Sequence, residues 1–220
     1  MKDLIDKGSV SRGWLGVGIQ DVSQDLAKAF KLKNTKGSLI TAVMENTPAQ
    51  RAGMLKGDVV VRINDKLIQN SNHLRNEIAN AGAFTEIDLE LIREGKSVKI
   101  KLKLDERPQK VGRVKMEPKM NPALEQLEFM GMTVEALTND KAEKLGVSPG
   151  IGVLISKIES GSTAEKAGLR TGMIIQEVER KAVKNFEIFK EIVNEMDKAK
   201  GILLLVTTSG GSRYIFIEEE

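Results

Sequence analysis

The stretch NTPAQRAGMLKGDVVVRIND, residues 46–65, carries clear local fold signals. Thr47 is a favoured helix N-cap, Pro48 suits the first helical position, and Gly53 suits the helix end. The β-branched run DVVVRIN, residues 58–64, follows and predicts a strand. The stretch therefore predicts a short helix, a loop and a strand in that order.

The same stretch returns 115 residues later as GSTAEKAGLRTGMIIQEVER, residues 161–180. The offset of 115 also places Gly16 on Gly131 and Trp14 on Phe129. Because a unit of roughly 90 to 100 residues is large enough for its own core, each copy is expected to fold as a domain rather than as one element of a solenoid. The chain is therefore predicted to hold two copies of one fold.

The domain boundaries follow from the repeat. The first domain is expected at residues 12–104 and the second at residues 123–220. Residues 105–122 are polar, hold three of the five prolines, and are expected to form a linker.

The remaining patterns of each copy complete the fold class. Residues 71–81 carry apolar side chains at helical spacing, and residues 86–104 alternate apolar and polar positions around a turn, which predicts a β-hairpin. A small sheet with two or three helices indicates an α+β domain.

Composition excludes several classes of protein. The 220-residue chain has no cysteine, a net charge of +3 and one histidine, so disulfides and thiol chemistry are excluded and no cofactor or metal site is expected. The opening residues lack the apolar segment of a signal peptide, and no apolar run approaches a membrane span. The mild charge disfavours a nucleic-acid surface.

The glycine-rich stretch RGWLGVGIQ, residues 12–20, does not fit a phosphate-binding loop. The dinucleotide motif needs a third glycine where Asp21 stands, and the P-loop needs a Lys-Ser/Thr pair that does not follow. The stretch Ser209–Gly211 suggests a serine nucleophile, but the only histidine, His73, lies in the other copy. No catalytic set is therefore expected, and residues 209–211 are interpreted as a hairpin turn.

A clamp for the end of a peptide remains. Successive amides in a glycine-containing turn can hold a carboxylate, and the strand that leaves the turn can accept an extended peptide. The amides of Leu15, Gly16 and Val17 are the predicted carboxylate donors. The full predicted set is Arg12, Trp14, Leu15, Gly16, Val17, Gly18, Ile19, Gln20, Leu74 and Ile78.

Within this set the expected roles differ. Gly18, Ile19 and Gln20 are expected to pair with the peptide backbone, and Arg12 to add a favourable charge. The pocket for the last side chain is expected to be lined by Leu15, Val17, Ile19, Leu74 and Ile78. Plain core packing is the alternative for every apolar member. For His73, a solvated helix face is favoured over a contact with the peptide.

The second copy has a matching candidate site at Phe129, Met130, Gly131, Met132, Phe189 and Val193. Glu125 and Glu128 lie just upstream of its turn, where like charge opposes a carboxylate by roughly 1 kcal/mol. This second site is expected to be weaker or unoccupied, and its apolar surfaces are an alternative contact for another domain or subunit.

The segment Trp14–Val17, the stretch at residues 46–65 and the helix NHLRNEI, residues 72–78, resemble a PDZ domain of the HtrA/Deg family of bacterial serine endopeptidases. The second copy is similar to the second PDZ domain of that family, and residues 1–11 resemble the connector from its protease domain. The resemblance implies that each copy is a small, partly open β-barrel or sandwich.

The resemblance also implies a function. Such PDZ domains act in periplasmic protein quality control, and they capture C-terminal or exposed apolar peptide segments and help to regulate the protease. The expected partners are peptides with apolar end residues, the protease domain and sister subunits. The alternative is a module that mainly holds protease subunits in trimers or cages. The protease domain has no counterpart in this chain.

Overall fold

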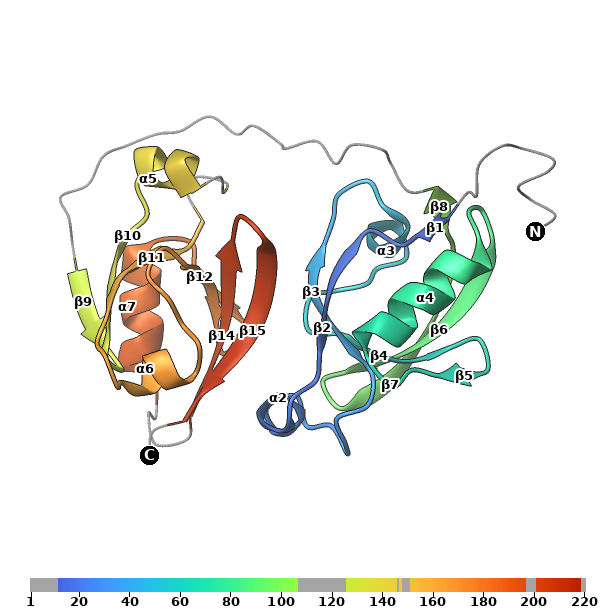
Figure 1. The fold of residues 1–220 in the computed structure, drawn as a ribbon, viewed down its shortest axis with the longest axis horizontal. Coiled ribbons are helices and arrows are strands. Elements are labelled where there is room, and N and C mark those ends of the chain that lie inside the picture. Colours follow the sequence, from blue (N-terminus) through green and yellow to red (C-terminus); the bar gives the residue numbers. More distant parts are fainter. Residues whose placement is uncertain (1–11, 107–125, 146, 148–150, 197–200, 219–220) are drawn as a thin grey trace. The chain divides into compact units, whose positions relative to one another are not determined.

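The structure is a computed structural model that describes residues 12–106, 126–145, 147, 151–196 and 201–218 (Figure 1). The chain divides into two compact units, residues 1–112 and 113–220. The predicted connector, residues 1–11, and most of the predicted linker lie outside the described residues.

The first unit contains three helices and eight strands among its described residues. In chain order they are β1 (Gly13–Trp14), β2 (Val17–Asp21), α2 (Gln24–Ala29), β3 (Ser38–Val43), α3 (Pro48–Arg51), β4 (Val59–Ile63), β5 (Lys66–Leu67), α4 (Ser71–Ala81), β6 (Glu86–Arg93), β7 (Lys96–Lys103) and β8 (Asp105–Glu106).

Over its described residues, the second unit repeats the order from β1 to β7, with a longer strand at its start. Its elements are β9 (Gln126–Phe129), β10 (Met132–Ala136), α5 (Asn139–Leu145), β11 (Val153–Ile158), α6 (Thr163–Lys166), β12 (Ile174–Val178), β13 (Lys181–Ala182), α7 (Phe186–Asn194), β14 (Ile202–Thr208) and β15 (Gly211–Ile217).

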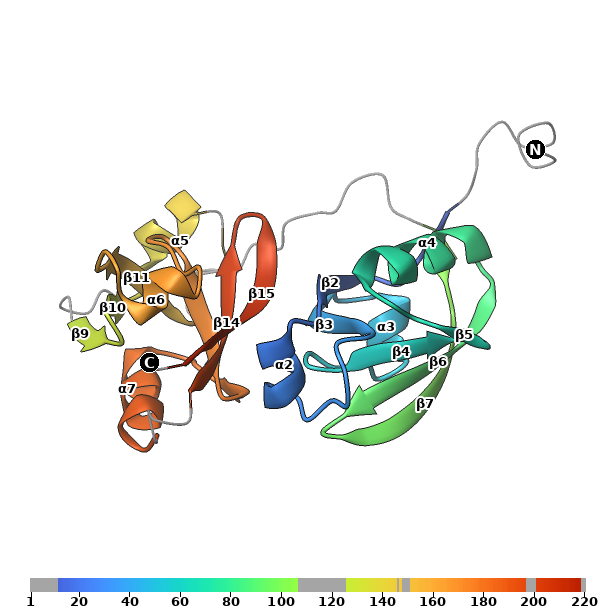
Figure 2. The ribbon, with the colours of Figure 1, turned by 60° about the horizontal axis from the view of Figure 1, so that its bottom comes forward.

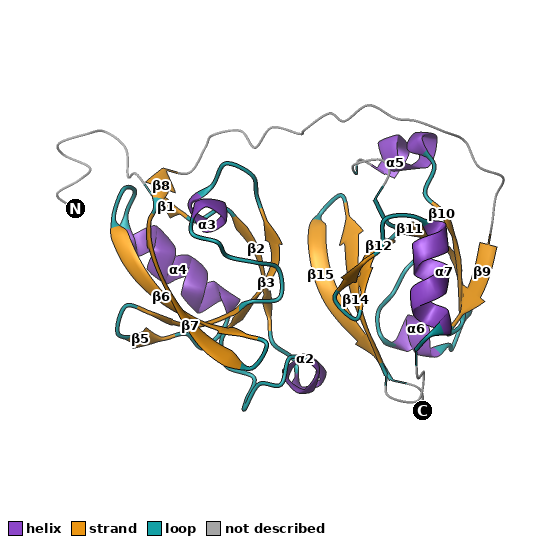
Figure 3. Cartoon of the chain, turned by 180° about the vertical axis from the view of Figure 1, so that it is seen from behind, coloured by secondary structure: helices purple, strands orange, loops and turns teal. Residues whose placement is uncertain are grey.

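Antiparallel sheets dominate both units, so the predicted α+β class with two PDZ-like domains is confirmed. The main sheet of the first unit has the order β2-β3-β4-β6-β7, with β5 paired to β4, and the hairpin of β6 and β7 is long (Figure 2). The sheet of the second unit has the order β15-β14-β12-β11-β10-β9, with β13 paired to β12. Figure 3 shows α4 and α7 in purple, each beside the strands of its own unit.

The predicted local signals are found where the sequence places them. Thr47 caps α3, with its side chain accepting a hydrogen bond from the Gln50 amide, and Pro48 opens the helix. Asn70 caps α4 in the same way. One difference concerns the linker: Asp105 and Glu106 form β8, which pairs with β1 and extends the first unit beyond residue 104.

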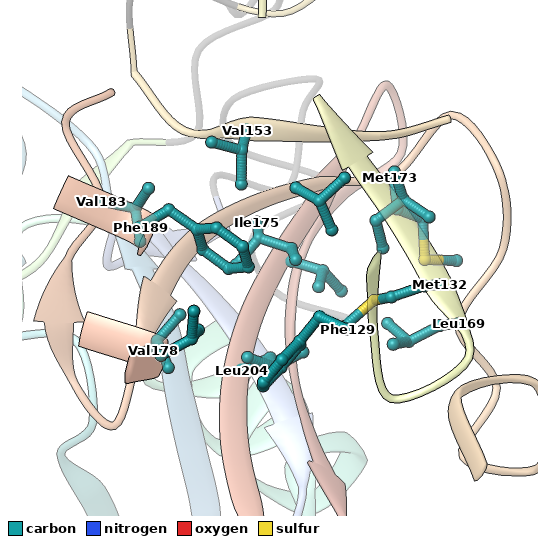
Figure 4. Packing of buried hydrophobic residues seen from close by; sticks show 14 of the residues in the cluster. Phe129, Met132, Val153, Leu169, Met173, Ile175, Val178, Val183, Phe189 and Leu204 are labelled. Atoms are coloured by element: carbon teal, nitrogen blue, oxygen red, sulfur yellow. The ribbon is translucent and has the colours of Figure 1, made fainter. Parts of the chain in front are cut away.

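Each unit has its own hydrophobic core. In the first unit it lies between α4 and the sheet and includes Leu15, Ile40, Leu74 and Ile78. In the second unit it lies against α7 and includes Phe129, Met132 and Phe189 (Figure 4). Because each core is built from the sheet and the long helix of one unit, each unit is built as a domain in its own right.

Candidate peptide-binding site

The bend before β2 is held against the cap of α3. Gly16 has φ +81°, a conformation that favours glycine, and a Cβ added to it would lie 2.3 Å from Cβ of Thr47. The Leu15 carbonyl accepts a hydrogen bond from the Ala49 amide at 3.1 Å. In the described part of the chain, no hydrogen bond has the Leu15 or Gly16 amide as its donor. The bend is therefore fixed through its carbonyls and not through its amides.

The register of β2 shows which way the Val17 backbone points. The Met44 amide donates to the Gly16 carbonyl at 3.0 Å, and Val17 lies opposite Val43. In an antiparallel ladder this makes Val17 and Val43 a non-hydrogen-bonded pair, so the N–H and C=O of Val17 point away from β3.

Ile19 has the same orientation. It lies opposite Ile40, beyond a bulge in the ladder. The Ile40 amide donates at 2.8 Å to the carbonyl of Asp58, the residue directly before β4. Because the backbone of Ile40 is turned toward β4, the backbone of its partner Ile19 also points away from β3.

These outward groups face an edge of the sheet. β2 is the end strand of its sheet, and no described strand pairs with its outer side. Gly18 and Gln20 alternate with Val17 and Ile19 and direct their backbone groups toward β3 instead. Of the three residues predicted to pair with a peptide, Ile19 has the required orientation, while Gly18 and Gln20 are turned toward the sheet interior. Val17 takes the other outward position.

The side chains of the predicted set divide between core and edge. Leu15, Leu74 and Ile78 are buried at 2%, 0% and 7% exposure, so all three belong to the core. Val17 and Ile19 are half-buried against that core. Core packing alone therefore accounts for the burial of the first three, and their part in a pocket stays a prediction. Arg12 is exposed, and Trp14 is half-buried in β1, where it pairs with Asp105.

His73 lies beside Glu77 on α4. Its Nδ1 accepts a hydrogen bond from the Gln69 amide at 3.3 Å, and its Nε2 is 3.7 Å from Oε1 of Glu77. Glu77 also binds Lys66 of β5 at 2.8 Å, which places this side of α4 beside β5. The backbone amide of Ser71, the first residue of α4, donates to the side chain of Asp21 at the end of β2.

The second unit differs at the matching place. β10, which corresponds to β2 at the offset of 115, pairs with β11 on one side and with β9 on the other. Met130 and Gly131 form the turn between β9 and β10, and the flanking Phe129 and Met132 are buried at 3% and 1% exposure. Phe189 and Val193 of α7 are buried in the same core. The second unit thus has the residues of the predicted site, but the edge of β10 is already paired with β9.

Other kinds of site are not found in the described residues. No group of three or more His, Asp or Glu side chains there could hold a metal ion. No helix in the described part of the chain is long and apolar enough to cross a membrane.

Comparison with known proteins agrees with the geometry. Residues 13–104 match the family model of the PDZ domain. A probable periplasmic serine endoprotease, DegP-like, of Chlamydia pneumoniae is 32% identical over 218 residues, which is 99% of this chain and 42% of that protein. The protein of the same description from Bartonella henselae is 33% identical over 217 residues, 98% of this chain and 42% of that protein.

One similar solved structure is that of the HtrA-type protease AlgW with a decapeptide. It is 29% identical and covers 50% of this chain and 34% of its own, with a TM-score of 0.45. The chain thus spans about two fifths of the length of the two curated relatives, in agreement with a stretch of PDZ domains alone. Residues 13–104 thus form a PDZ domain, and the two PDZ-like domains of the chain match DegP-like HtrA proteases over 99% of its length.

Proposed function

We propose that the first domain binds extended peptides that end in an apolar residue, and that it does so by adding them as a strand to β2. The observation that carries the proposal is the outward orientation of the Val17 and Ile19 backbones at an edge where no described strand is paired. Main-chain pairing at such an edge supplies affinity, and side-chain pockets beside it supply specificity.

The bend supports a fixed direction for the peptide. The amides of Leu15 and Gly16 donate to no described partner, and the amide of Val17 points outward next to them. Three successive amides form a concave donor set that suits a carboxylate. A peptide whose C-terminus lies at this bend runs antiparallel to β2.

A fluorescence-polarisation titration tests this proposal. Peptides ending in Val, Leu or Phe are expected to bind with Kd values on the order of micromolar, because a short added strand buries a small area. Amidation of the peptide C-terminus should weaken binding at least tenfold. Equal affinity for the free acid and the amide would rule out the carboxylate role of residues 15–17.

The outward amide of Ile19 supplies a second test. Ile19→Pro removes a donor that faces the open edge but leaves the hydrogen bonds to β3, a position that an edge strand tolerates. The variant should keep the circular dichroism spectrum of the parent and lose most peptide affinity. Unchanged affinity would show that the peptide binds elsewhere.

The role in the cell is proposed from the relatives. We propose that the chain is part of a periplasmic HtrA/Deg-type serine protease-chaperone and that peptide capture at β2 regulates its protease domain. The support is the roughly 30% identity to proteins described as periplasmic DegP-like proteases. Protease activity of the full-length protein should rise when a peptide that binds β2 is added, and Ile19→Pro should abolish that rise.

A second candidate function is assembly of protease subunits. The closed edge of β10 favours it for the second domain, because a domain whose edge is already paired has less use as a peptide receptor. Deleting residues 105–220 from the full-length protein should then reduce the size of its assemblies, measured by sedimentation velocity.

A further inference from the structure

The segment before the turn follows different routes in the two domains. In the first domain, Gly13 and Trp14 pair with β8 and leave the outer side of β2 without a described partner. In the second domain, β9 folds back and pairs with β10 along residues 126–129. Among the described residues, equivalent edges of the same fold are therefore unpaired in one copy and covered in the other.

The turn between β9 and β10 explains the fold-back. Met130 has φ +51° and Gly131 has φ +75°, and these two residues alone separate the paired Phe129 and Met132. Two central residues with positive φ give a type I′ turn, which closes a tight hairpin. The corresponding pair in the first domain is Leu15 and Gly16, and of these two only Gly16 has a positive φ. The chain there continues past β2 instead of turning onto it.

The direction and register of β9 match those of the proposed peptide. β9 is antiparallel to β10, with Phe129 opposite Met132 and Leu127 opposite Val134. Met132 and Val134 correspond, at the offset of 115, to Val17 and Ile19. β9 thus takes the place of a peptide whose last residue is apolar, with Phe129 at the end nearest the turn.

The backbone groups of β10 are oriented for this partner. The Glu159 amide donates to the Gly131 carbonyl at 2.8 Å, so the backbone of Met132 is turned from β11 toward β9. The Ile155 amide donates to Met173 at 2.9 Å, so Ile155 faces β12 and its partner Val134 faces β9.

Phe129 anchors β9 at the turn end. Its ring meets the ring of Phe189 edge to face, with centroids 5.9 Å apart and planes at 85°. Figure 4 shows both rings in the cluster that also holds Met132 and Leu204. Phe189 and Val193 correspond to Leu74 and Ile78 on α4 of the first domain. An aromatic pair of this kind contributes roughly 0.5–1.5 kcal/mol beyond its burial.

A polar contact anchors the other end of β9. The Gln126 side chain donates to Oε2 of Glu135 at 3.3 Å, and Nζ of Lys141 lies 2.6 Å from Oε1 of the same carboxylate. Glu135 is 5% exposed, so its carboxylate is held by partners from β9 and α5. The strand is therefore fixed at both of its ends.

We propose that β9 is a built-in ligand strand that closes the peptide edge of the second domain, so that the chain presents one open peptide site, on the first domain. The proposal rests on the proposed function, because it takes the strand-addition edge of the first domain as the reference. It also predicts the peptides that bind the edge of β2. Like β9, they should have an apolar residue at the last position and another two positions before it.

Hydrogen exchange of the unmodified chain tests the closure directly. The Val134 amide, paired to β9, should exchange at least 100-fold more slowly than the Ile19 amide, which faces the open edge. Adding a peptide ending in Gln-Leu-Glu-Phe should slow exchange at Ile19 and leave Val134 unchanged. Equally fast exchange at both amides without peptide would overturn the closure.

Two proline variants test whether β9 is the barrier. Leu127 turns its N–H toward β10, whereas Glu128 turns its N–H away, so Leu127→Pro should release β9 and Glu128→Pro should leave it in place. Both are made together with Ile19→Pro, which removes the first site. A fluorescein-labelled peptide ending in Gln-Leu-Glu-Phe should then bind only the chain with Leu127→Pro.

The outcomes separate this proposal from the proposed function. If the chain with Ile19→Pro alone binds the labelled peptide as tightly as the Leu127→Pro chain does, the second edge is open and the built-in ligand is ruled out. If the unmodified chain never binds the peptide, the proposed function fails, while the exchange of Val134 still decides the closure. Should Leu127→Pro unfold the second domain, that exchange measurement on the unmodified chain remains decisive.

Discussion

The Asp21 carboxylate accepts a hydrogen bond from the Ser71 amide, with 2.7 Å between Oδ1 and N, and so joins the last residue of β2 to the first residue of α4. The Ser71 hydroxyl also lies 2.9 Å from that of Ser38 in β3, and both serines are buried. These contacts fix the start of α4 relative to the open edge. The matching residues of the second domain are apolar, namely Ala136, Phe186 and Val153, and all are buried.

Asp21→Ala should therefore loosen the start of α4. The loss of one charge-assisted hydrogen bond at a helix N-terminus is expected to cost about 1–2 kcal/mol in the free energy of unfolding of the first domain. Peptide affinity should fall severalfold, because the helix flanks the edge at which the peptide binds. Urea denaturation followed by the fluorescence of Trp14, the only tryptophan, measures the first effect.

Asp21→Asn is the matched control, because an amide oxygen can still accept from the Ser71 amide. It should recover at least half of the lost stability and affinity. If Asp21→Ala and Asp21→Asn behave alike, the charge near the helix end matters and the hydrogen bond does not.

Much of the fold follows from the sequence because its signals are local and occur twice. The bounds of β2 and β10, of β3 and β11, and of α3 and α6 coincide once 115 is added to the first member of each pair. Caps, prolines and glycines at matching positions specify the same turns in both copies, since these residues act over three or four neighbours.

The route of the chain before the turn could not be predicted in this way. Residues 14–17 and 129–132 share the order apolar, apolar, glycine, apolar, yet only the second stretch closes into a hairpin. The strand before the bend pairs with β8 in the first domain, whereas the strand before the turn pairs with β10 in the second. The pairing of β1 with β8 joins residues that are far apart in the sequence, so local patterns do not predict it. The sequence suggests like-charge repulsion from Glu125 and Glu128 as the reason for a weak second site, whereas the structure points to a covered edge.

Helical spacing in the sequence also does not show whether an apolar residue of α4 is buried in the core or contacts a peptide. Leu74 and Ile78 share a face of α4, which predicts that they are covered but not what covers them. The structure shows that Leu74 is fully buried within its own domain. Leu74→Lys is therefore expected to unfold the first domain, since a lysine at this position would lack a partner for its charge.

Gly16 gives a prediction about the bend itself. An alanine there meets two penalties, the positive φ of +81° and a contact of 2.3 Å with Thr47. Gly53 has a similar φ of +71° but nothing within 4 Å of an added Cβ. Gly53→Ala should therefore cost about 1–2 kcal/mol, which is the conformational penalty alone.

Gly16→Ala should cost at least about 2 kcal/mol more than this control, because the bend must move away from the α3 cap. Chemical denaturation of both variants measures the difference. Equal costs for the two variants would mean that the contact with Thr47 relaxes freely and does not fix the bend.

The buried Asp58 forms an ion pair with the partly exposed Arg93, and the matching positions of the second copy hold no such pair. The guanidinium donates to both carboxylate oxygens at 2.7 Å, and the Asp58 side chain is 1% exposed. The hydrogen bond to Asp58 raises the pKa of Arg93 above its ordinary value. The residues at the matching positions are Met173 and Thr208.

Arg93→Thr alone should destabilise the first domain by roughly 3 kcal/mol, because it leaves a buried carboxylate without its cation. The double variant Asp58→Met with Arg93→Thr copies the second domain and should recover most of this loss. Thermal or urea unfolding of the two variants checks the order. A double variant less stable than the single one would show that the pair is needed for packing in this copy.

Tyr214 gives a pH-dependent prediction for the second domain. Its hydroxyl donates to Oε2 of Glu177 at 3.0 Å, and both side chains are buried. Burial, and then the negative charge of Glu177, raise the pKa of Tyr214 above its ordinary value. A phenol that resists ionisation only in the folded state adds stability below the unfolded pKa of about 10, and this stability falls as the pH rises above that value.

Between the unfolded and the folded pKa, the loss should approach about 1.4 kcal/mol per pH unit. Tyr214→Phe should remove this part of the pH dependence, because phenylalanine does not ionise. Tyr214 is the only tyrosine in the chain, so the ultraviolet absorbance of tyrosinate follows its ionisation alone. If the absorbance rises near pH 10 while the circular dichroism stays native, the hydroxyl is not held by Glu177 and the predicted loss of stability is wrong.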